Sequence, residues 1–237
     1  MIRVAAIGDI HLGLDSRDYL RPHLEGLADD ADVFVIAGDL TKCGTADEAR
    51  VVAAELRDVR IPCIAVLGNH DFHADEQDKV TAIMAEAGVT VLEGTSASID
   101  VGGQRLGIAG AKGFGGGFIG AMASEFGEPE MKAFVHHTKV VAQQLSTALR
   151  SLDTDVKVAV THYSPVEDTL EGERREIYPF LGSYLLAEAV DGCGVVMALH
   201  GHAHAGREHG CTPGGTPVRN VAQPVLGVAY KVYVVAS

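Results

Sequence analysis

Residues 3–11 read RVAAIGDIH, an apolar run that ends in a glycine, a carboxylate and an imidazole. Similar short apolar runs return along the chain and alternate with segments whose hydrophobic residues recur at helical spacing. Strands that are apolar on both faces are typical of a sheet covered by helices, so the pattern predicts an α/β fold. The expected central strands are Arg3–Ile7, Val33–Ala37, Cys63–Leu67, Val156–Val160 and Val195–Leu199.

Polar side chains follow the end of each of these runs. The endings are Gly8-Asp9-Ile10-His11, Gly38-Asp39, Gly68-Asn69-His70-Asp71, Thr161-His162 and Gly201-His202-Ala203-His204. In an open α/β sheet the carboxyl ends of the strands line one crevice, so we expect these side chains to meet there. Turn and cap preferences explain Asp and Asn, but they would supply Ser and Gly as readily as His. The pattern therefore predicts a binding site.

The chemistry of these side chains indicates a metal centre. Carboxylate or amide oxygens together with imidazole nitrogens suit borderline divalent cations such as Mn²⁺, Fe²⁺ or Zn²⁺. The candidate ligands are Asp9, His11, Asp39, Asn69, His162, His202 and His204. This set exceeds what one ion with an open position uses, so we expect two ions, and the bridging role falls most naturally on Asp39 because it is the lone candidate after its strand. Two such ions clamp the attacking and leaving oxygens of a phosphoryl group, which favours phosphate ester hydrolysis.

Taken in order, these segments resemble the calcineurin-like metallophosphoesterase superfamily, whose pattern is D-x-H, G-D, G-N-H-[DE], H and G-H-x-H. The match runs from Asp9 to His204, which is most of the chain. The resemblance implies an α/β, four-layer αββα sandwich with two mixed β-sheets flanked by helices, and we expect one domain over residues 1–237. It also implies that one ion is held by Asp9, His11, Asp39 and His204. The other ion would be held by Asp39, Asn69, His162 and His202.

His70 and Asp71 have a separate task by the same resemblance. His70 is expected near the substrate as the catalytic acid that protonates or stabilises the leaving oxygen. Asp71 is expected to accept the other N–H of His70 and so to fix its tautomer and charge. The nucleophile would be a metal-bridging hydroxide that attacks phosphorus in line, so no Ser or Cys nucleophile is needed. The alternative is that the two residues form a purely structural hydrogen-bonded pair.

Departures from relatives narrow the expected substrate. Residues 40–44 read LTKCG, whereas the Ser/Thr protein phosphatases of the superfamily carry an arginine at the position of Cys43 that clamps phosphate. Lys42 stands where purple acid phosphatases carry a tyrosine. The G-D-L-T stretch resembles the bacterial cyclic-nucleotide and small phosphodiesterase branch, which favours a small phosphodiester. The alternatives are a phosphomonoesterase, a nuclease with the same metal centre, and a non-catalytic binding scaffold of the same fold.

The composition bounds the partners and the setting. Of 237 residues, 47% are hydrophobic and 22% charged, which is enough to bury a large core. The 19 Lys and Arg against 32 Asp and Glu give a formal net charge of −13, which argues against nucleic acid or an anionic membrane and favours a small anionic phosphoester. The four cysteines form no C-x-x-C pair and no signal-peptide pattern precedes the first strand, so we expect a cytoplasmic protein with reduced thiols.

Other segments carry weaker expectations. A helix is expected from Pro129 to about Ser151, a hairpin around Gly102-Gly103, and antiparallel strand from Pro217 to Val235. Core-facing helical stripes are expected at Leu20, Leu24 and Leu27, at Val51, Val52 and Leu56, and at Val80, Ile83 and Met84.

Three features leave alternatives open. The glycine-rich segment Gly107–Gly120 is either a flap over the cleft or a plain surface loop. Neither its G-x-G-x-x-G stretch nor Lys112 has the context of a dinucleotide or phosphate loop. His200 is either a buried core residue or a partner of a metal ligand. Tyr163-Ser164-Pro165 and the run Glu171–Glu176 form either a lid, a subunit contact or a solvated loop.

Overall fold

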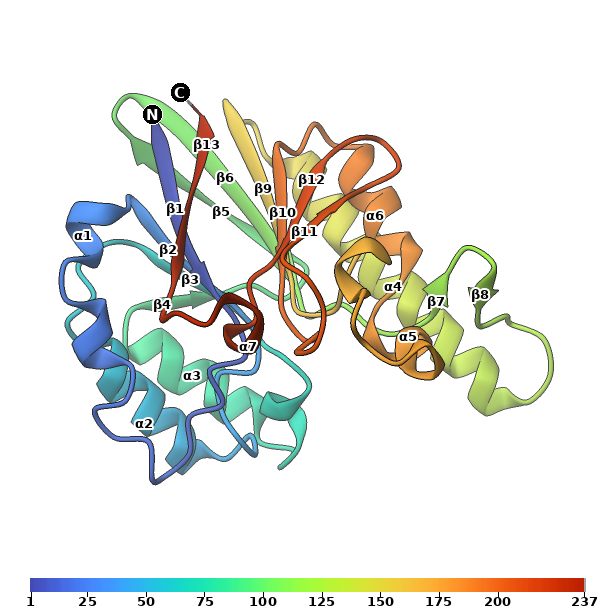
Figure 1. Cartoon of the computed structure of the whole chain (residues 1–237), viewed down its shortest axis with the longest axis horizontal. Helices are drawn as coiled ribbons and strands as arrows, with labels where there is room; N and C mark the ends of the chain where they lie inside the picture. Colours follow the sequence, from blue (N-terminus) through green and yellow to red (C-terminus); the bar gives the residue numbers. More distant parts are fainter. Residues whose placement is uncertain (237) are drawn as a thin grey trace.

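Two β-sheets pack face to face between two layers of helices, as Figure 1 shows for residues 1–236, the part of the chain that this computed structural model describes. The layer between the sheets is apolar, and its fully buried members include Val4 and Val35 from one sheet and Ile108 and Val158 from the other. This arrangement confirms the predicted αββα sandwich with two mixed sheets.

The first sheet is built from the N-terminal half of the chain and the C-terminal strand. Its strand order is β13 (Lys231–Ala236), β1 (Ile2–Ile7), β2 (Val33–Ala37), β3 (Cys63–Val66) and β4 (Val89–Val91). Strands β1 to β4 run parallel, and β13 pairs antiparallel with β1. The carboxyl ends of β1, β2 and β3 therefore lie at one edge of this sheet.

The second sheet is built from strands between residues 95 and 220. Its strand order is β11 (His209–Cys211), β12 (Pro217–Asn220), β10 (Met197–His200), β9 (Val156–Thr161), β6 (Gln104–Ala111) and β5 (Thr95–Val101). Strands β12, β10, β9 and β6 run parallel, whereas β11 and β5 are antiparallel edge strands. Every predicted central strand is present in one of the two sheets, with ends that differ from the expectation by at most two residues.

Helices cover the outer face of each sheet. The first sheet is covered by α1 (Leu27–Asp30), α2 (Ala46–Leu56) and α3 (Gln77–Glu86). The second is covered by α4 (Pro129–Ser151) and α6 (Tyr184–Asp191). The remaining helical segments are α5 (Tyr178–Leu181), α7 (Gln223–Leu226) and the 3₁₀ turns η1 (Arg21–Leu24), η2 (His70–Phe72), η3 (Asp168–Leu170) and η4 (Arg175–Ile177).

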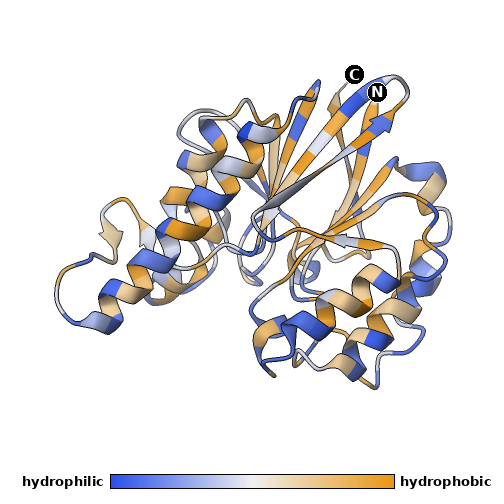
Figure 2. Ribbon diagram, turned by 180° about the vertical axis from the view of Figure 1, so that it is seen from behind, coloured by the Kyte–Doolittle hydropathy of each residue, from blue (hydrophilic) through white to orange (hydrophobic). Residues whose placement is uncertain are grey.

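The longest helix begins and ends where the sequence predicts. Pro129 occupies the first turn, where its missing N–H has no helical partner to lose, and the helix ends at Ser151. Val141, Leu145 and Leu149 face the second sheet, and Figure 2 shows hydrophobic and hydrophilic residues alternating along α4 as an amphipathic helix requires. The hairpin is confirmed as well, with β5 and β6 joined across Gly102-Gly103. No helix formed by residues 1–236 combines the length and the apolar character needed to cross a bilayer.

The helix predicted from Leu20, Leu24 and Leu27 is wrong as a continuous helix. Leu20 and Leu27 are buried and Leu24 packs against the same core, so the stripe does face inward. However, Gly26 has φ of 85° and separates the turn η1 from the four-residue α1. A glycine in the left-handed region ends a helix readily, and the apolar spacing does not reveal it.

The two C-terminal strands and the glycine-rich segment differ in part from expectation. Strand β12 is antiparallel to β11 but parallel to β10, and α7 separates it from β13.

Of the segment Gly107–Gly120, the residues up to Ala111 belong to β6, and Gly117–Phe118 and Ala121–Met122 form the small hairpin β7–β8. Only part of the segment Gly107–Gly120 is therefore a loop.

The two segments for which a lid was one alternative differ from each other in burial. Tyr163, Ser164 and Pro165 are buried beneath α5 and α6, so they form part of the core and not a lid. The run Glu171–Glu176 is mostly exposed, which fits the solvated loop.

Candidate metal centre

The loops after β1 and β2 run side by side and bring their polar residues together. The backbone N–H of Asp9 donates to the carbonyl of Gly38 at 3.0 Å, and that of His11 donates to the carbonyl of Asp39 at 3.0 Å. In the second sheet the N–H of Gly201 donates to the carbonyl of His162 at 3.1 Å, which couples the ends of β9 and β10 in the same way. The strand ends of each sheet are thus held in fixed register at the edge where the site forms.

Several of the candidate ligands have a strained backbone. The φ angles of Asp9, His11, Asp39 and His202 are 58°, 43°, 51° and 70°. For residues other than glycine this left-handed conformation costs about 1–2 kcal/mol each, although Asp tolerates it better than most. Such strain persists where the surrounding structure imposes it, and it gathers at functional sites. The strained backbone therefore directs these side chains toward the other candidate ligands, and this orientation costs conformational free energy.

Glycines precede the ligands because the ligands approach them too closely for a side chain. A Cβ atom on Gly68 would overlap Oδ1 of Asp39, and one on Gly201 would overlap Oδ2 of Asp9, both far inside the 3.0 Å that real Cβ atoms keep. The glycines of the Gly-Asn and Gly-His pairs are therefore a packing requirement of the site.

The first group of donor atoms joins the ends of β1, β2 and β10. It consists of Asp9, His11, Asp39 and His204, whose candidate donor atoms all lie within 4.8 Å of one another. Nε2 of His204 lies 2.9 Å from Oδ1 of Asp9 and 3.4 Å from Nε2 of His11. Nε2 of His11 lies 3.6 Å from Oδ2 of Asp39. These contacts leave a compact cluster of oxygen and nitrogen donors at one point.

The second group joins the ends of β2, β9 and β10. It consists of Asp39, His162 and His202, again within 4.8 Å of one another. Nε2 of His162 lies 3.3 Å from Oδ1 of Asp39 and 2.9 Å from Oδ1 of Asn69, so the amide lies in the same cluster. Asp39 thus presents Oδ2 to one group and Oδ1 to the other. The structure brings all of the predicted ligands together in the two sets that the family resemblance implied.

Carbonyl groups fix the tautomers of two histidines. Nδ1 of His162 lies 2.9 Å from the carbonyl of Ala37, and Nε2 of His202 lies 3.2 Å from the carbonyl of Phe180. A carbonyl only accepts, so these nitrogens carry protons and the opposite nitrogens are the ones left to bind an ion, which for the protonated His162 requires loss of the proton on Nε2. Carbonyl-anchored imidazoles of this kind are typical of metal ligands.

The electrostatics of the cluster are those of a cation site. Burial acts to raise the pKa of Asp39, but the charge of His162 and the hydrogen bonds from His162 and from the N–H of His70 outweigh it and hold the pKa well below its ordinary value. Burial lowers the pKa of His162, but the charge of Asp39 and a hydrogen bond to it prevail and raise this pKa to about 9. Burial and the positive charge of His162 lower the pKa of His202 to about 3.

The donor set fits divalent cations. Asp9 and Asp39 are 2% and 1% exposed, and within residues 1–236 no Lys or Arg lies within 4.0 Å of either carboxylate. Buried carboxylates require a positive partner, and among residues 1–236 the positive groups within 4.0 Å of these two are imidazoles. Mixed oxygen and imidazole donors match Mn²⁺, Fe²⁺ or Zn²⁺.

His70 lies against the first donor group. Its ring centroid is 4.4 Å from that of His11, and its backbone N–H donates to Oδ1 of Asp39 at 2.8 Å. Nδ1 of His70 lies 2.8 Å from the carbonyl of Lys42. The expectation that Asp71 accepts this N–H is wrong, because the carbonyl of Lys42 is the acceptor for Nδ1.

Asp71 instead joins the loops after β2 and β3. Its Oδ1 accepts from the N–H of Thr41 at 2.8 Å and from the Thr41 hydroxyl at 2.6 Å. Its Oδ2 accepts from the N–H of Gly68 at 2.8 Å and of Leu40 at 3.2 Å. The side chain is fully buried, and both oxygens already have two donors each. Asp71 therefore contacts the backbone next to Asp39 and next to Asn69.

The other histidines lie outside the two donor groups. His200 is fully buried, with Nε2 2.8 Å from the Thr169 hydroxyl and Nδ1 2.7 Å from the carbonyl of Gly201, so it is a satisfied core residue at the base of the ligand loop. The exposed histidines are His23, His73, His136, His137 and His209. The cysteines, Cys43, Cys63, Cys193 and Cys211, are all free thiols outside the donor groups.

The sequence pattern assigned no role to Lys112, which the structure places beside the centre. Lys112 follows β6 directly, and because Ala111 pairs with Thr161, it lies level with His162. Burial lowers the pKa of Lys112, and the charges of Glu93 and Asp39 partly oppose this. The signal in the sequence was that β6 also ends at this edge of the sheet, but Lys112 matches no recognised motif.

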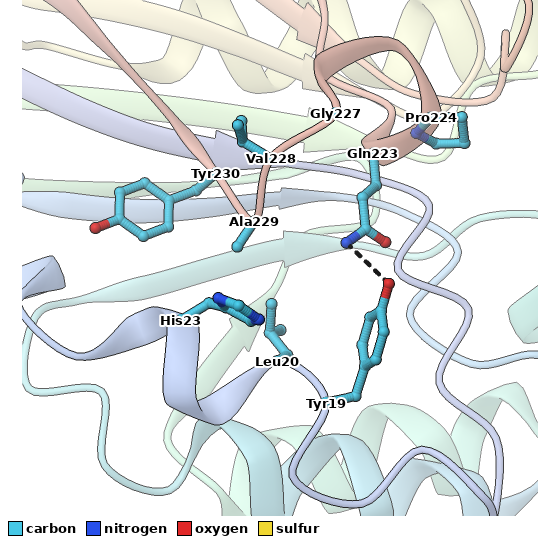
Figure 3. Close-up of a pocket in the computed structure, with 9 residues that line it drawn as sticks. All are labelled: Tyr19, Leu20, His23, Gln223, Pro224, Gly227, Val228, Ala229 and Tyr230. Atoms are coloured by element: carbon cyan, nitrogen blue, oxygen red, sulfur yellow. Dashed lines mark hydrogen bonds between the residues drawn. The ribbon is translucent and has the colours of Figure 1, made fainter.

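A separate pocket adjoins the loop that carries Asp9. Figure 3 shows this pocket of about 790 Å³, with Tyr19, Gln223 and Tyr230 among its lining residues and Nε2 of Gln223 3.5 Å from the Tyr19 hydroxyl. The backbone N–H of Gln223 donates to the carbonyl of Gly8 at 2.9 Å. The lining includes none of the candidate ligands, so the pocket and the donor groups are distinct features.

Comparison with known proteins identifies the family. A family model for calcineurin-like phosphoesterases matches residues 2–206, so the chain belongs to that family. No curated protein is similar enough to the chain to match it.

Solved structures share the fold at low identity. Phosphopantetheinyl hydrolase (PptH) from Mycobacterium tuberculosis superimposes with a TM-score of 0.70 at 17% identity, over 98% of this chain and 95% of that one. A protein from Thermus thermophilus gives 0.62 at 16% identity, over 99% of both chains. A putative 5'-nucleotidase from Staphylococcus aureus gives 0.58 at 17% identity, over 92% of this chain and 48% of that one. At these identities the likeness establishes the fold.

Proposed function

We propose that this chain is a dinuclear metal-dependent phosphoesterase that hydrolyses a small phosphodiester. The observation that carries the proposal is the position of Asp39, whose two oxygens face two separate donor groups. Family membership supports a metal-dependent phosphoester hydrolase, and the donor set supports divalent cations. We further propose that residues 1–237 form a single domain, because both sheets contribute donors to one site.

The proposed ligands divide between the two ions. Asp9, His11, Asp39 and His204 would hold one, and Asp39, Asn69, His162 and His202 the other. When bound, two divalent cations would lower the pKa of a water molecule and neutralise the phosphate oxygens, so that water attacks phosphorus in line. Asp39 keeps the two ligand sets together.

His70 would act on the leaving group. Because the carbonyl of Lys42 accepts from Nδ1, Nε2 is the nitrogen left to give a proton or a hydrogen bond to the departing oxygen. Asp71 would act as a positioning residue, through the loops that it joins. The preference for a diester rests on the Leu40-Thr41 sequence after Asp39 and on Cys43, which stands in place of a phosphate-clamping arginine.

The substrate is expected to be small and anionic. The net charge of −13 disfavours a long polyanion such as nucleic acid, whereas a bound pair of cations creates a local positive site for one phosphate group.

The test compares chelator-treated and Mn²⁺-reconstituted protein on an aryl phosphodiester and an aryl phosphomonoester. The reconstituted protein should contain close to two ions per chain and hydrolyse the diester faster. Asp39→Ala should reduce both metal occupancies; one ion retained with full activity would contradict the shared carboxylate. Faster hydrolysis of the monoester would indicate a phosphomonoesterase. Cleavage of a polynucleotide would indicate a nuclease. If metal-loaded protein hydrolyses no ester, the chain is a binding scaffold.

A matched pair of histidine variants tests the acid. His70→Ala should lower kcat by about 10²- to 10⁴-fold with unchanged metal content, as expected for loss of a general acid. His73→Ala removes an exposed histidine three positions further on and should leave kcat unchanged. An equal loss in both variants, or none in His70→Ala, would contradict the assignment.

A further inference from the structure

Lys112 is a buried lysine without an ion pair. It is 9% exposed, and within residues 1–236 its ammonium group has no carboxylate within 4.0 Å. Buried charges in proteins are ordinarily paired, because an unpaired one is costly to remove from water. The charges of Glu93 and Asp39 act on the ammonium group only from beyond 4.0 Å, so an anion in direct contact with it is still missing.

Aromatic rings set the position of the ammonium group. Nζ of Lys112 lies 4.9 Å from the ring centroid of Phe72, 5.2 Å from that of Phe114 and 5.4 Å from that of Tyr163. The faces of aromatic rings attract cations, so the rings hold the ammonium group in place. They cannot neutralise its charge, and the requirement for an anion persists.

The same rings connect Lys112 to the metal centre. The carbonyl of Lys112 accepts from the N–H of His162 at 2.9 Å and of Tyr163 at 3.0 Å. The Tyr163 ring packs against the ring of His202 at 4.4 Å. Phe72 ends the turn η2 that begins with His70. The ammonium group is thus held by side chains that adjoin two proposed ligands and the proposed acid.

We propose that Lys112 binds the phosphate group of the substrate at the side of the centre formed by His162 and His202. The inference rests on the proposed function and names the residue that supplies the cationic contact to the phosphate. A phosphate oxygen between the ions and the ammonium group is the anion that would satisfy Lys112. It also separates like charges, since a third cation beside two metal ions is otherwise repelled. Lys112 would thereby supply the positive contact that Cys43 cannot.

The experiment measures phosphate binding directly, with inorganic phosphate titrated calorimetrically into Mn²⁺-loaded protein. Lys112→Met keeps an unbranched side chain, one atom shorter, and removes the charge. It should weaken phosphate binding about 10- to 100-fold, the range for loss of a hydrogen bond to a charged group, and raise KM for the diester by a similar factor. Lys157→Met is the matched control, because Lys157 lies at the opposite end of β9 and should leave both values unchanged.

Thermal unfolding separates phosphate binding from a structural role. A lysine kept only for its ring contacts would lower Tm when replaced, whereas removal of a buried, unpaired charge should leave Tm unchanged or raise it, since Met packs well against aromatic rings. Unaltered phosphate affinity in Lys112→Met, or a lower Tm with unaltered affinity, would overturn the proposal. Should this variant fail to fold, Lys112→Gln is titrated instead, and the same affinity result decides.

The two proposals fail in different ways. If wild-type protein hydrolyses no ester, the proposed function is wrong. The phosphate titration needs no turnover and still decides the role of Lys112.

Discussion

Replacement of Asp71 by Asn should destabilise the fold and not merely alter catalysis. The carboxylate accepts four hydrogen bonds, from Leu40, from the N–H and hydroxyl of Thr41, and from Gly68. Asn retains one acceptor oxygen. In the better orientation that oxygen stays with Gly68 and Leu40, and the new NH₂ group meets the N–H of Thr41. Two donors then lose their acceptor: the Thr41 hydroxyl can rotate to accept from the NH₂ group, but the buried N–H of Thr41 is left unsatisfied.

The magnitude follows from these contacts. A buried, unsatisfied donor costs about 1–3 kcal/mol, and hydrogen bonds to a neutral amide are weaker than those to a carboxylate by about 1 kcal/mol. We expect the free energy of unfolding to fall by about 2–4 kcal/mol. At about 2–4 °C per kcal/mol for a chain of this size, Tm should fall by about 5–15 °C.

The assay is thermal unfolding of the metal-free protein, because bound ions would stabilise the folded state and mask the effect. Asp78→Asn is the control: Asp78 is exposed in the first turn of α3, and its loss should change Tm by little. A variant Asp71→Asn with wild-type Tm and greatly reduced kcat would refute this reasoning. That result would restore the direct action of Asp71 on His70 that the sequence suggested.

Other substitutions and the pH dependence test the remaining geometry. Gly68→Ala should lower metal content measured by elemental analysis, because its Cβ would displace Asp39, whereas Gly192→Ala, whose Cβ meets no atom closer than 3.6 Å, should not. Thr45→Ala should remove the capping box of α2 and lower the free energy of unfolding by about 1 kcal/mol with hydrolysis unchanged; a kcat loss would contradict this. The pKa of His162 is raised to about 9 from 6.5 in the metal-free protein, so its pairing with Asp39 stabilises fully below pH 6.5 and is lost as pH rises through about 9. Metal uptake at neutral pH should displace this proton, and calorimetry in buffers of different ionisation enthalpy should detect its release. Metal binding without proton release would contradict the reasoning.

The parts of the fold and site that follow from the sequence are those set by local pattern. Each central strand is short and apolar, and the polar residue that follows it lies at a fixed edge of its sheet, so the pattern alone is enough to place Asp9 and Asp39 together. The break in the helix at Gly26 does not follow from the pattern, because hydrophobic spacing does not encode where a chain enters the left-handed region.

The roles of Asp71 and Lys112 depend on contacts between distant segments. The family resemblance implied that Asp71 pairs with His70, but its oxygens accept from backbone groups of Leu40 and Thr41, about thirty residues away, and from Gly68. Lys112 becomes part of the site only through the register of β6 against β9, which aligns Ala111 with Thr161. The hydrogen-bond partners of Asp71 and the register of β6 against β9 are both set by contacts with distant segments, so neither follows from the local sequence.

The distribution of donors explains why the site needs both halves of the chain. The first sheet supplies the oxygen donors, Asp9, Asp39 and Asn69, whereas the second supplies His162, His202 and His204. The distance between these two sets is fixed by the apolar layer between the sheets, which includes Val35 and Val158. Because interiors are closely packed, this layer holds the sheets at one separation, and the donor atoms meet only at that separation. The motifs therefore specify which atoms can bind a cation, and the hydrophobic contact between the sheets determines that they do so at one point.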